Sequence, residues 1–454
     1  MKCDTARHKF GVDILSGSLP RCPGRSGGME EEHRTDPDEA MAAIPARVRD
    51  PLSEKEAVQA FAGRPAALPI RLALSGGGVR AAAFHAGVLR RLAHEDLLER
   101  VSHVSTVSGG SLLVSAVMTL NGLTWPGSAA YRDVVFPSLR RLLTTVDLFS
   151  AKAIGWSGLF RFNRRLLTHR ASVLADLLAD RWGVTARVRD LPESPIWFIN
   201  TTSLHSGKNW RFSSREMGDW VFGRHYAPDV RLAEAAAASA AVPYVLGAFW
   251  LDLPAEGWFR TDPATRKPLQ RTQPPTTRIG LWDGGAYENL GLEAIYKPGQ
   301  APAPEAFVIC SDASGPVPPF GATSPFAILK GRLAGPRLFD IASDQIRALR
   351  SRMFMRDVEG ETLRGALFKM GVSVRDVDIL ARRTRPERDY DGYLRDADVR
   401  AALGHPTDLR AMSPAVFERI SRHGFEVADT VLTTHSPDLF PETHRWTPAA
   451  DTRP

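Results

Sequence analysis

Three short motifs in the chain place a reactive side chain or bare backbone beside glycine. The first is Val107-Ser108-Gly109-Gly110, in which two glycines follow a serine at once. Between a strand and a helix, such a serine can occupy a sharp turn that exposes its hydroxyl as a nucleophile. The same tetrapeptide also suits an ordinary helix N-cap, so taken alone it does not identify a nucleophile.

The second motif is a run of three glycines in Ser75-Gly76-Gly77-Gly78-Val79-Arg80. Glycine N–H groups can approach an oxyanion closely, and one such donor contributes about 3 kcal/mol in comparable sites. We therefore interpret Gly76, Gly77 and Gly78 as a candidate oxyanion hole. Arg80 is a supporting residue that either braces the loop or stays on the surface. A dinucleotide-binding loop is the alternative, although the spacing departs from G-x-G-x-x-G.

The third motif is Trp282-Asp283-Gly284-Gly285, an aspartate that ends an apolar run. Its carboxylate could accept the proton of a serine if burial raised its pKa toward neutrality. Gly284 and Gly285 would let this turn come close to a ligand. An ordinary Asp-Gly β-turn is the alternative, because such turns are common.

The elements around the first two motifs should bring them to one edge of a sheet. Apolar runs predict strands at 70–74 and 103–107, with helices at 79–92 and 111–120. This order is a βαβ unit, whose crossover makes the two strands parallel, so both loops emerge where α/β folds bind ligands. The same signals predict further strands at 196–200, 278–282 and 305–311, and helices at 172–182, 230–240, 343–354 and 414–432.

In this order and spacing the three motifs resemble the patatin-like phospholipase family. A fourth segment, Ala238-Ser239-Ala240-Ala241-Val242-Pro243, is similar to the family's Ala-Ser-x-Ala-x-Pro. The resemblance covers about residues 69–316 and continues weakly to about residue 429. It implies a three-layer α/β/α sandwich with a mostly parallel central sheet. It also implies a Ser–Asp dyad without histidine, in which Ser108 is the nucleophile and Asp283 its base, with Gly109, Gly110, Gly284 and Gly285 in support.

The sequence departs from the family pattern at three positions. The elbow of the family usually reads G-x-S-x-G, and Thr106 stands at the first glycine. Ser75 precedes the glycine loop where the family often has Asp, and Ala81 follows it where the family often has Gly. A β-branched residue at position 106 fits only if the backbone there stays in the β region.

Histidine could complete a triad instead of a dyad. His405 and His423 follow Asp283, which is the chain order of α/β-hydrolases. His405 lies in a loop flanked by Gly and Pro, and His423 lies in a helical stretch; we predict that both are surface residues. His85 is predicted to pack near the glycine loop. The dyad therefore remains the preferred interpretation.

The resemblance implies a serine lipid acyl hydrolase of the phospholipase or lysophospholipase type, working through an acyl-enzyme. Its substrate would be a lipid ester, and no metal or cofactor is expected. A catalytically silent lipid-binding or scaffold protein on the same fold remains an alternative. A nucleotide-binding protein that uses the glycine loop is a second alternative.

Composition is that of an ordinary globular protein, long enough for one large α/β domain or two smaller ones. The chain has 454 residues, of which 43% are hydrophobic, and its net charge of +7 permits peripheral contact with an anionic membrane surface. No nucleic-acid-binding motif is present, so nucleic acid is not an expected partner. Three scattered cysteines, together with the lack of a signal peptide or an apolar span, lead us to expect a cytoplasmic protein, peripheral at the membrane.

Changes in composition divide the chain into three parts. Residues 1–66 are rich in Gly, Pro and charged residues and predict a disordered extension, residues 67–434 form the catalytic domain, and residues 435–454 a polar tail. Within the domain, residues 257–277 predict a surface insertion. Residues 140–170 interleave arginines with aromatic residues, which suits an anionic lipid interface or an acyl-pocket cap, and equally an ordinary helical segment.

Overall fold

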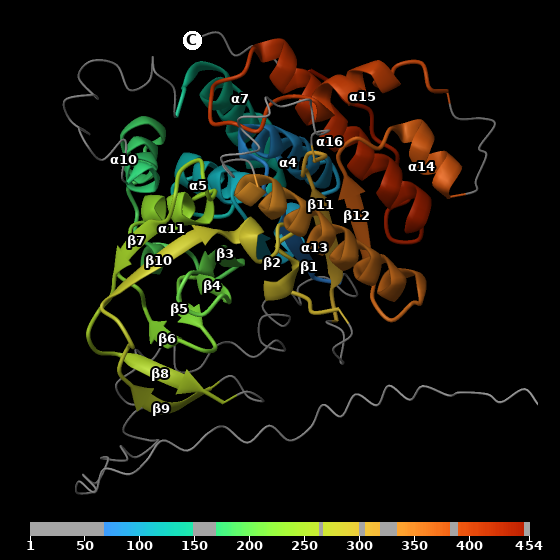
Figure 1. Cartoon of the computed structure of the whole chain (residues 1–454). Coiled ribbons are helices and arrows are strands. Elements are labelled where there is room, and N and C mark those ends of the chain that lie inside the picture. Colours follow the sequence, from blue (N-terminus) through green and yellow to red (C-terminus); the bar gives the residue numbers. More distant parts are fainter. Residues whose placement is uncertain are drawn as a thin grey trace, which may run out of the picture. The chain divides into compact units, whose positions relative to one another are not determined.

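The computed structural model describes residues 68–148, 169–262, 267–298, 305–317, 334–381 and 389–448, all within the unit formed by residues 36–454 (Figure 1). The extension predicted at 1–66 lies outside the described residues. So do residues 149–168, the greater part of the basic and aromatic segment. Among the helices of the described ranges, none combines the length and the hydropathy that a membrane-spanning segment requires.

The βαβ unit predicted from the sequence lies at the centre of the sheet. It consists of β1 (Ile70–Leu74), α4 (Gly78–Ala93), β2 (Val101–Thr106) and α5 (Gly109–Leu120). Parallel pairing extends over the order β12-β11-β1-β2-β3. The other three strands of this set are β3 (Ile196–Ser203), β11 (Phe307–Asp312) and β12 (Gly365–Lys369).

Beyond β3 the sheet becomes antiparallel. Short strands joined by tight turns pair in this way because parallel pairing needs a long crossover. The path continues β3-β4-β5-β6-β8-β9, while β10 pairs with β3 and β7. These strands are β4 (Asn209–Phe212), β5 (Glu216–Asp219), β6 (Gly223–Tyr226), β7 (Phe249–Asp252), β8 (Trp258–Thr261), β9 (Pro268–Thr272) and β10 (Arg278–Asp283).

The described strands therefore form one mixed sheet of 12, in which parallel order is confined to five. The α/β class is confirmed, but the expectation of a mostly parallel sheet holds only for that central part. The surface insertion predicted at 257–277 contains the β8–β9 hairpin. It extends the antiparallel edge of the sheet.

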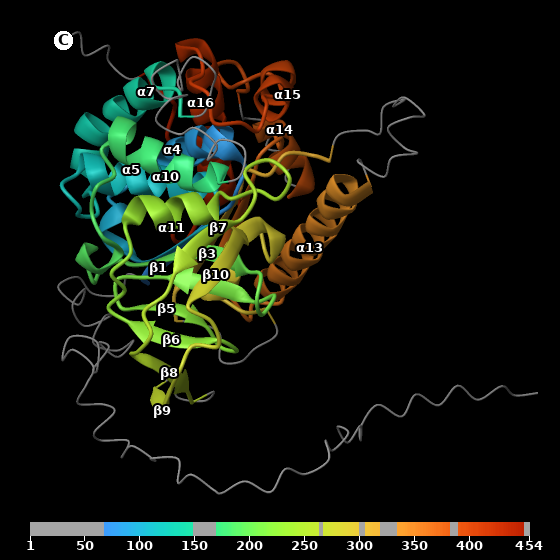
Figure 2. The same cartoon turned by 60° about the vertical axis from the view of Figure 1, so that its left-hand side comes forward.

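Helices cover both faces of the parallel strands and give three layers (Figure 2). Because successive strand residues point to opposite faces, Leu72 and Leu74 of β1 join a large core beneath α4 and α5, whereas Ala73 joins a smaller one with Phe354. The predicted three-layer α/β/α sandwich is confirmed. The remaining α-helices of the described residues are α6 (Ser128–Ala130), α7 (Phe136–Thr145), α10 (Arg170–Trp182), α11 (Leu232–Ser239), α13 (Ala334–Glu359), α14 (Val374–Leu380), α15 (Asp396–Leu403) and α16 (Pro414–His435).

Helices α4 and α16 cross with their backbones almost in contact. A Cβ atom on Gly87 would lie 1.7 Å from the carbonyl oxygen of Ser421, and one on Gly424 would lie 2.1 Å from that of Phe84. No side chain fits at either position. The two glycines therefore set the distance between the helix that follows the glycine loop and the C-terminal helix.

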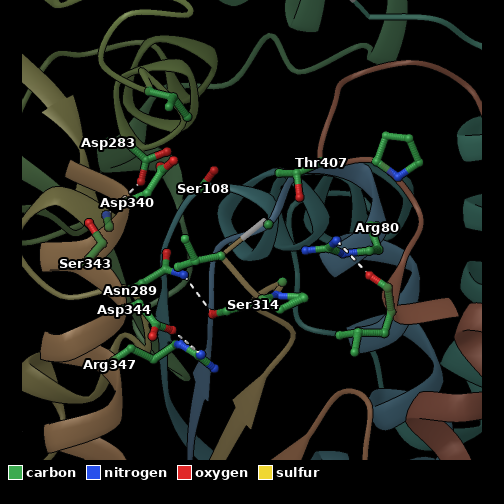
Figure 3. Close-up of a pocket in the computed structure, with 18 of the residues that line it drawn as sticks. Arg80, Ser108, Asp283, Asn289, Ser314, Asp340, Ser343, Asp344, Arg347 and Thr407 are labelled. Atoms are coloured by element: carbon green, nitrogen blue, oxygen red, sulfur yellow. Dashed lines mark hydrogen bonds and ion pairs between the residues drawn. The ribbon is translucent and has the colours of Figure 1, made fainter. Parts of the chain in front are cut away.

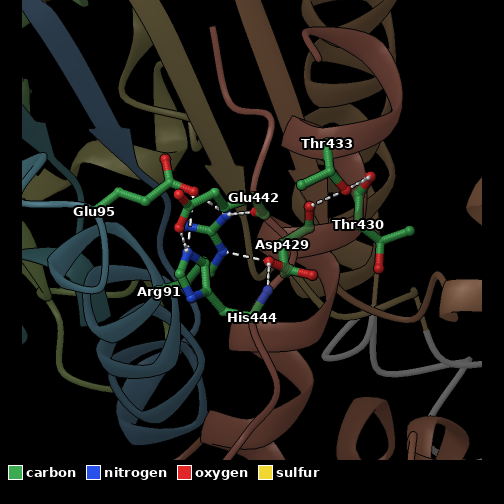
Figure 4. Close-up of polar contacts among 7 residues, drawn as sticks. All are labelled: Arg91, Glu95, Asp429, Thr430, Thr433, Glu442 and His444. Carbon is green, nitrogen blue, oxygen red and sulfur yellow. Dashed lines mark hydrogen bonds and ion pairs between the residues drawn. The ribbon is translucent and has the colours of Figure 1, made fainter.

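A buried ion pair fixes the same two helices further along (Figure 4). Nε of Arg91, on α4, donates to the carboxylate of Asp429, on α16, and neither side chain is exposed to solvent. Arg91 also donates to Glu95 at 2.8 Å. Loss of either member would leave an uncompensated charge in the core, which typically costs about 3–5 kcal/mol.

Residues 436–448 belong to the folded structure, in contrast to the tail predicted from residue 435. Phe440 is fully buried, and its ring lies 5.1 Å from that of Phe307 between centroids. The backbone N–H of His444 donates to the carboxylate of Asp429 at 2.9 Å. The sequence here is polar and proline-rich, so a few widely spaced aromatic residues supply its burial without any periodic pattern.

Candidate functional site

Ser108 occupies the sharp turn between β2 and α5, as predicted. Its φ and ψ of 47° and −113° are rare for a residue with a side chain and cost about 1–3 kcal/mol. A Cβ atom on Gly109 would lie 2.2 Å from the carbonyl oxygen of Gly78, and one on Gly110 would lie 2.5 Å from that of Leu74. The two glycines after the serine are therefore required by close backbone contacts.

Thr106 leaves this turn undisturbed, although it replaces the glycine of the family elbow. It is the last residue of β2 and lies in register with Ile199 of β3, so its backbone stays in the β region that a β-branched residue prefers. Its side chain is fully buried, and its hydroxyl accepts a hydrogen bond from Nε1 of Trp197 at 2.9 Å. The departure at position 106 is therefore compatible with the elbow.

The glycine loop lies beside the elbow, but its three N–H groups are not equivalent. The N–H of Gly76 donates to the carbonyl oxygen of Asn289 at 3.1 Å, so it is not available as the oxyanion donor that we predicted. Gly77 and Gly78 adopt φ values of 140° and 62°. Their N–H groups, and that of Gly109, make no hydrogen bond to any other described residue. These three remain candidate donors to an oxyanion.

Asp283 ends β10, where it lies in register with Thr201 of β3. Its Oδ1 accepts the N–H of Gly285 at 2.7 Å. Burial raises the pKa of Asp283 to about 7, although hydrogen bonds from the Gly285 N–H and the Ser108 hydroxyl lower it. Figure 3 shows the carboxylate and the hydroxyl at the same cavity. A carboxylate in this state can accept a proton near neutral pH.

One segment at the end of α11 holds both side chains in place. Oγ of Ser239 accepts the backbone N–H of Ser108 at 3.0 Å. Two residues later, the carbonyl oxygen of Ala241 accepts the backbone N–H of Asp283 at 2.9 Å. The Ala-Ser-x-Ala-x-Pro segment of the sequence therefore fixes the elbow and the aspartate relative to each other.

A cavity of about 700 Å³ opens in front of these groups (Figure 3). Helix α13 forms one wall, with Phe339, Asp340 and Ser343. Residues 403–407 and 314–317 form the other walls. All three segments follow Asp283 in the chain, and none carries a motif that marks it as part of a site.

Arg80 is buried and braces two of these walls. Its Nη1 donates to the carbonyl oxygens of Leu403 and His405 at 3.1 and 2.8 Å, and Nη2 reaches that of Ala313 at 3.5 Å. Burial lowers the pKa of Arg80, although the charge of Asp312 opposes this effect. Arg80 therefore does not stay on the surface, and the hydrogen bonds that it makes brace the segments beside the glycine loop.

Asn289 is a site residue that the sequence reasoning missed. Besides accepting the N–H of Gly76, it donates through Nδ2 to Oγ of Ser314 at 2.8 Å. Cβ atoms on Gly76 and Gly285 would lie 2.3 and 2.7 Å from its Oδ1. Asn289 therefore connects the glycine loop to the aspartate turn. A polar residue inside the glycine-containing stretch after Asp283 was the available signal.

His85 packs near the glycine loop, as predicted, and is neutral. Its Nε2 donates to the carbonyl oxygen of Ser75 at 3.0 Å, because that oxygen can only accept, and Nδ1 accepts from Oγ of Ser311 at 2.8 Å. Burial lowers the pKa of His85 to about 4, outweighing the backbone hydrogen bond and the charge of Asp312. This ring ties the ends of β1 and β11 together.

The other two histidines do not complete a triad. His405 lines the cavity, whereas His423 is buried, contrary to the surface position that we predicted, and accepts the N–H of Gly371 at 2.9 Å. Burial lowers the pKa of His423 to about 3. Within the described part of the chain, neither ring hydrogen-bonds to Ser108 or Asp283.

Part of this chain matches a known protein family. The family model described as patatin-like phospholipase matches residues 72–296. A search of curated protein sequences gives no match.

Matches among solved structures include the following three. Human GIVD cytosolic phospholipase A2 has a TM-score of 0.47 and 14% identity, covering 85% of this chain and 61% of that chain. The same human protein in complex with methyl gamma-linolenyl fluorophosphonate has a TM-score of 0.46 and 15% identity, covering 88% of this chain and 62% of that chain. VipD from Legionella pneumophila has a TM-score of 0.26 and 12% identity, covering 54% of this chain and 50% of that chain. The chain thus spans less than two thirds of the length of the human chains.

The family match starts within β1 and ends shortly after the turn that follows Asp283. It therefore includes the glycine loop, the serine elbow, the Ser239 segment and the aspartate, which the fold brings to one edge of the sheet. Residues 72–296 of this chain are thus a patatin-like phospholipase domain by their match to the family model.

Proposed function

We propose that this protein is a serine hydrolase that cleaves carboxylic ester bonds of lipids through Ser108 and Asp283. The observation that carries the proposal is the buried carboxylate of Asp283, whose pKa is raised to about 7 and which accepts the Ser108 hydroxyl. An ordinary Asp-Gly turn needs no such burial. Perturbed carboxyl groups that face a nucleophile in a cavity are typical of catalytic sites.

In the acylation step, Asp283 takes the proton of the Ser108 hydroxyl while Oγ attacks the ester carbonyl carbon. The new C–O bond converts the carbonyl oxygen into an oxyanion. We expect the N–H groups of Gly77, Gly78 and Gly109 to stabilise that charge, each by about 3 kcal/mol as in comparable sites. Collapse of the intermediate breaks the ester bond, and the leaving alcohol takes the proton from Asp283.

In the second step, water hydrolyses the acyl-enzyme. Asp283 accepts a proton from the water as its oxygen attacks the acyl carbon, and the same N–H groups stabilise the second oxyanion. Release of the carboxylic acid returns the proton to Oγ of Ser108. One carboxyl group thus serves as base and acid in turn.

A lipid ester of phospholipid or lysophospholipid type is the substrate class that we propose. Val242, Val317 and Phe339 line the cavity around Ser108 and offer apolar contact to an acyl chain. A volume of about 700 Å³ is in the range of sites that bind small molecules. The net charge of +7 supports peripheral binding to an anionic membrane from which the lipid is taken. The buried free thiol of Cys310 supports a cytoplasmic location.

Covalent labelling by a fluorophosphonate probe tests this function directly. We expect stoichiometric labelling at Ser108 in the folded protein, no labelling of Ser108→Ala, and loss of hydrolysis of a short-chain phosphatidylcholine in that variant. Circular dichroism establishes that the variant is folded. If folded wild-type protein took no probe and released no fatty acid, the proposal would be wrong and a lipid-binding scaffold would be the better description.

A further inference from the structure

We propose that Thr106 is a positioning residue, which holds Ser108 in its strained conformation through a chain of buried hydroxyl groups. The inference rests on the proposed function, because it concerns the geometry of the nucleophile. The groups involved are the indole of Trp197, the hydroxyls of Thr106, Ser111 and Ser239, and the backbone of Ser108.

The end of the chain nearest to Ser108 fixes the direction of its hydrogen bonds. Oγ of Ser239 donates to the carbonyl oxygen of Asn200 at 2.7 Å, since a carbonyl oxygen can only accept. Its single proton is thereby used. Ser239 therefore accepts both the backbone N–H of Ser108, at 3.0 Å, and the hydroxyl of Ser111, at 2.8 Å.

The other end is fixed by the indole. Nε1 of Trp197 can only donate, and it donates to Oγ1 of Thr106 at 2.9 Å. Because Ser111 donates its proton to Ser239, the 2.8 Å bond between Thr106 and Ser111 is donated by Thr106, whose hydroxyl also lies 3.5 Å from the carbonyl oxygen of Phe198. The bonds thus run in one direction, from the indole through three hydroxyls to a carbonyl oxygen.

Burial makes this chain cooperative. Thr106, Ser111 and Ser239 are fully buried, and Trp197 is 2% exposed. A missing hydroxyl would leave a donor or acceptor unpaired where water cannot replace it. The backbone of Ser108, to which the hydroxyl chain is bonded, is strained and would gain free energy by relaxing. Loss of Thr106 should therefore appear as a loosened elbow.

The chain also reaches the aspartate. The carbonyl oxygen of Asn200, where the chain ends, would lie 2.6 Å from a Cβ atom on Gly284, the residue after Asp283. The side-chain amide of the same Asn200 donates to the carbonyl oxygen of Thr106 at 2.9 Å. The hydroxyl chain therefore contacts the backbone next to Ser108 and the backbone next to Asp283. A glycine at position 106 would keep this carbonyl oxygen but would lack the hydroxyl that joins Trp197 to Ser111.

Three variants test the proposal. Thr106→Val removes the hydroxyl at nearly constant shape, and Thr106→Ser restores it without the methyl group. Thr433→Val makes the same exchange at a buried threonine on α16, whose hydroxyl bonds only to backbone carbonyls of its own helix. Thr433→Val is therefore the matched control for a loss of stability that does not involve the elbow.

Two readouts separate positioning from general stability. For Thr106→Val we expect kcat on a soluble chromogenic ester, and the rate of fluorophosphonate labelling, to fall about tenfold with KM within about twofold. Thr106→Ser should recover most of both rates, and Thr433→Val should match the wild type. Hydrogen exchange of the Ser108 amide, which does not depend on any reaction, should accelerate about tenfold in Thr106→Val alone.

The outcomes distinguish this inference from the proposed function. Folded Thr106→Val with wild-type kcat and wild-type protection of the Ser108 amide would overturn the role of Thr106. Wild-type protein that neither labels nor hydrolyses esters would overturn the proposed function, while the exchange measurement would still decide whether Thr106 holds the elbow.

Discussion

The parallel strands of the sheet end in the loops that carry Gly77, Gly78 and Ser108, whereas β4, β5, β6, β8 and β9 contribute no residue that lines the cavity. Asp283 comes from β10, which pairs with β3 where the two parts of the sheet meet. The parallel part thus supplies crossover loops at a common edge, which antiparallel strands joined by tight turns cannot supply.

The antiparallel part instead contributes an aromatic cluster to the large core that it shares with the parallel strands. Trp210, Phe222 and Trp258 are buried, and their ring centroids lie 5.2–5.9 Å apart. Aromatic pairs in this geometry add about 0.5–1.5 kcal/mol each beyond the area they bury. Because the antiparallel part contributes to the core but not to the cavity, substitutions there should lower stability and leave the chemistry intact.

The largest effect on activity should come from the junction of the two parts. Asp283→Asn removes the proposed base at nearly constant shape, and general-base catalysis is worth about 10²–10⁴-fold. We expect ester hydrolysis to fall by at least about 10³-fold, measured as kcat on a chromogenic ester. Asp229→Asn, at an exposed carboxylate, is the control. Substantial activity in the Asp283 variant would show that another group serves as base.

A smaller loss of activity should follow from Gly109→Ala on the parallel side. The added Cβ would lie 2.2 Å from the carbonyl oxygen of Gly78, so the elbow and the glycine loop must separate. Misplacement of reacting groups by about 1 Å can cost about 10²-fold, and we expect a loss of that size in kcat. Gly122→Ala is the control, because no atom lies within 4 Å of the Cβ that it adds. We expect this variant to lose stability without losing kcat.

On the antiparallel side, Trp258→Ala should affect stability and spare chemistry. Truncation of a buried aromatic side chain costs about 3–5 kcal/mol, which urea denaturation would measure. The kcat per labelled site should stay within about twofold of wild type. Trp220→Ala, at a side chain that is 68% exposed, should change stability by less than about 0.5 kcal/mol. A parallel loss of kcat in folded Trp258→Ala would contradict the separation of the two parts.

The smallest expected effect is a pH-dependent gain in stability when Asp283 is replaced by asparagine. The pKa of Asp283 is raised from its ordinary value to about 7 in the folded state, so the fold favours the protonated form. The contribution of the protonated Asp283 carboxyl to stability is fully present below the pKa of Asp283 in the unfolded chain, and it is lost as pH rises through about 7. Asp283→Asn should therefore raise Tm by a few degrees at pH 8 and by less at pH 5. Wild-type kcat should fall below about pH 7, where the base is protonated. A Tm difference that does not vary with pH would contradict the raised pKa.

The central βαβ unit could be predicted from the sequence because several signals agreed there. The apolar run 70–74 is the strand observed, and glycine marks the start of the helix after each strand. Apolar residues recur along both strands because the strands are mostly buried, although Arg71 interrupts β1 and Ser102, His103 and Ser105 interrupt β2. The positions of Ser108 and Asp283 followed from the same runs, since each lies at the end of a strand.

The antiparallel strands and the cavity walls could not be predicted in this way. β4, β5 and β6 have four residues each and contain glycine or charged side chains, so no alternation stands out. The walls at 339–347 and 403–407 are brought to Ser108 only by tertiary packing. The use of the Gly76 N–H by Asn289 is likewise a tertiary contact, which glycine content cannot reveal.

The crossing of α4 and α16 has a consequence for the order in which the molecule is made. Helix α4 carries the glycine loop at its start, yet the outer face of that helix is closed by Gly424 and Asp429, which the ribosome adds more than 300 residues later. A nascent chain that ends before α16 leaves Arg91 without Asp429 and the face of α4 around Gly87 uncovered. Folding that proceeds from the N-terminus therefore leaves the helix after the glycine loop without this packing partner during most of translation. Competence to bind an ester should arrive late in synthesis, together with the C-terminal helix.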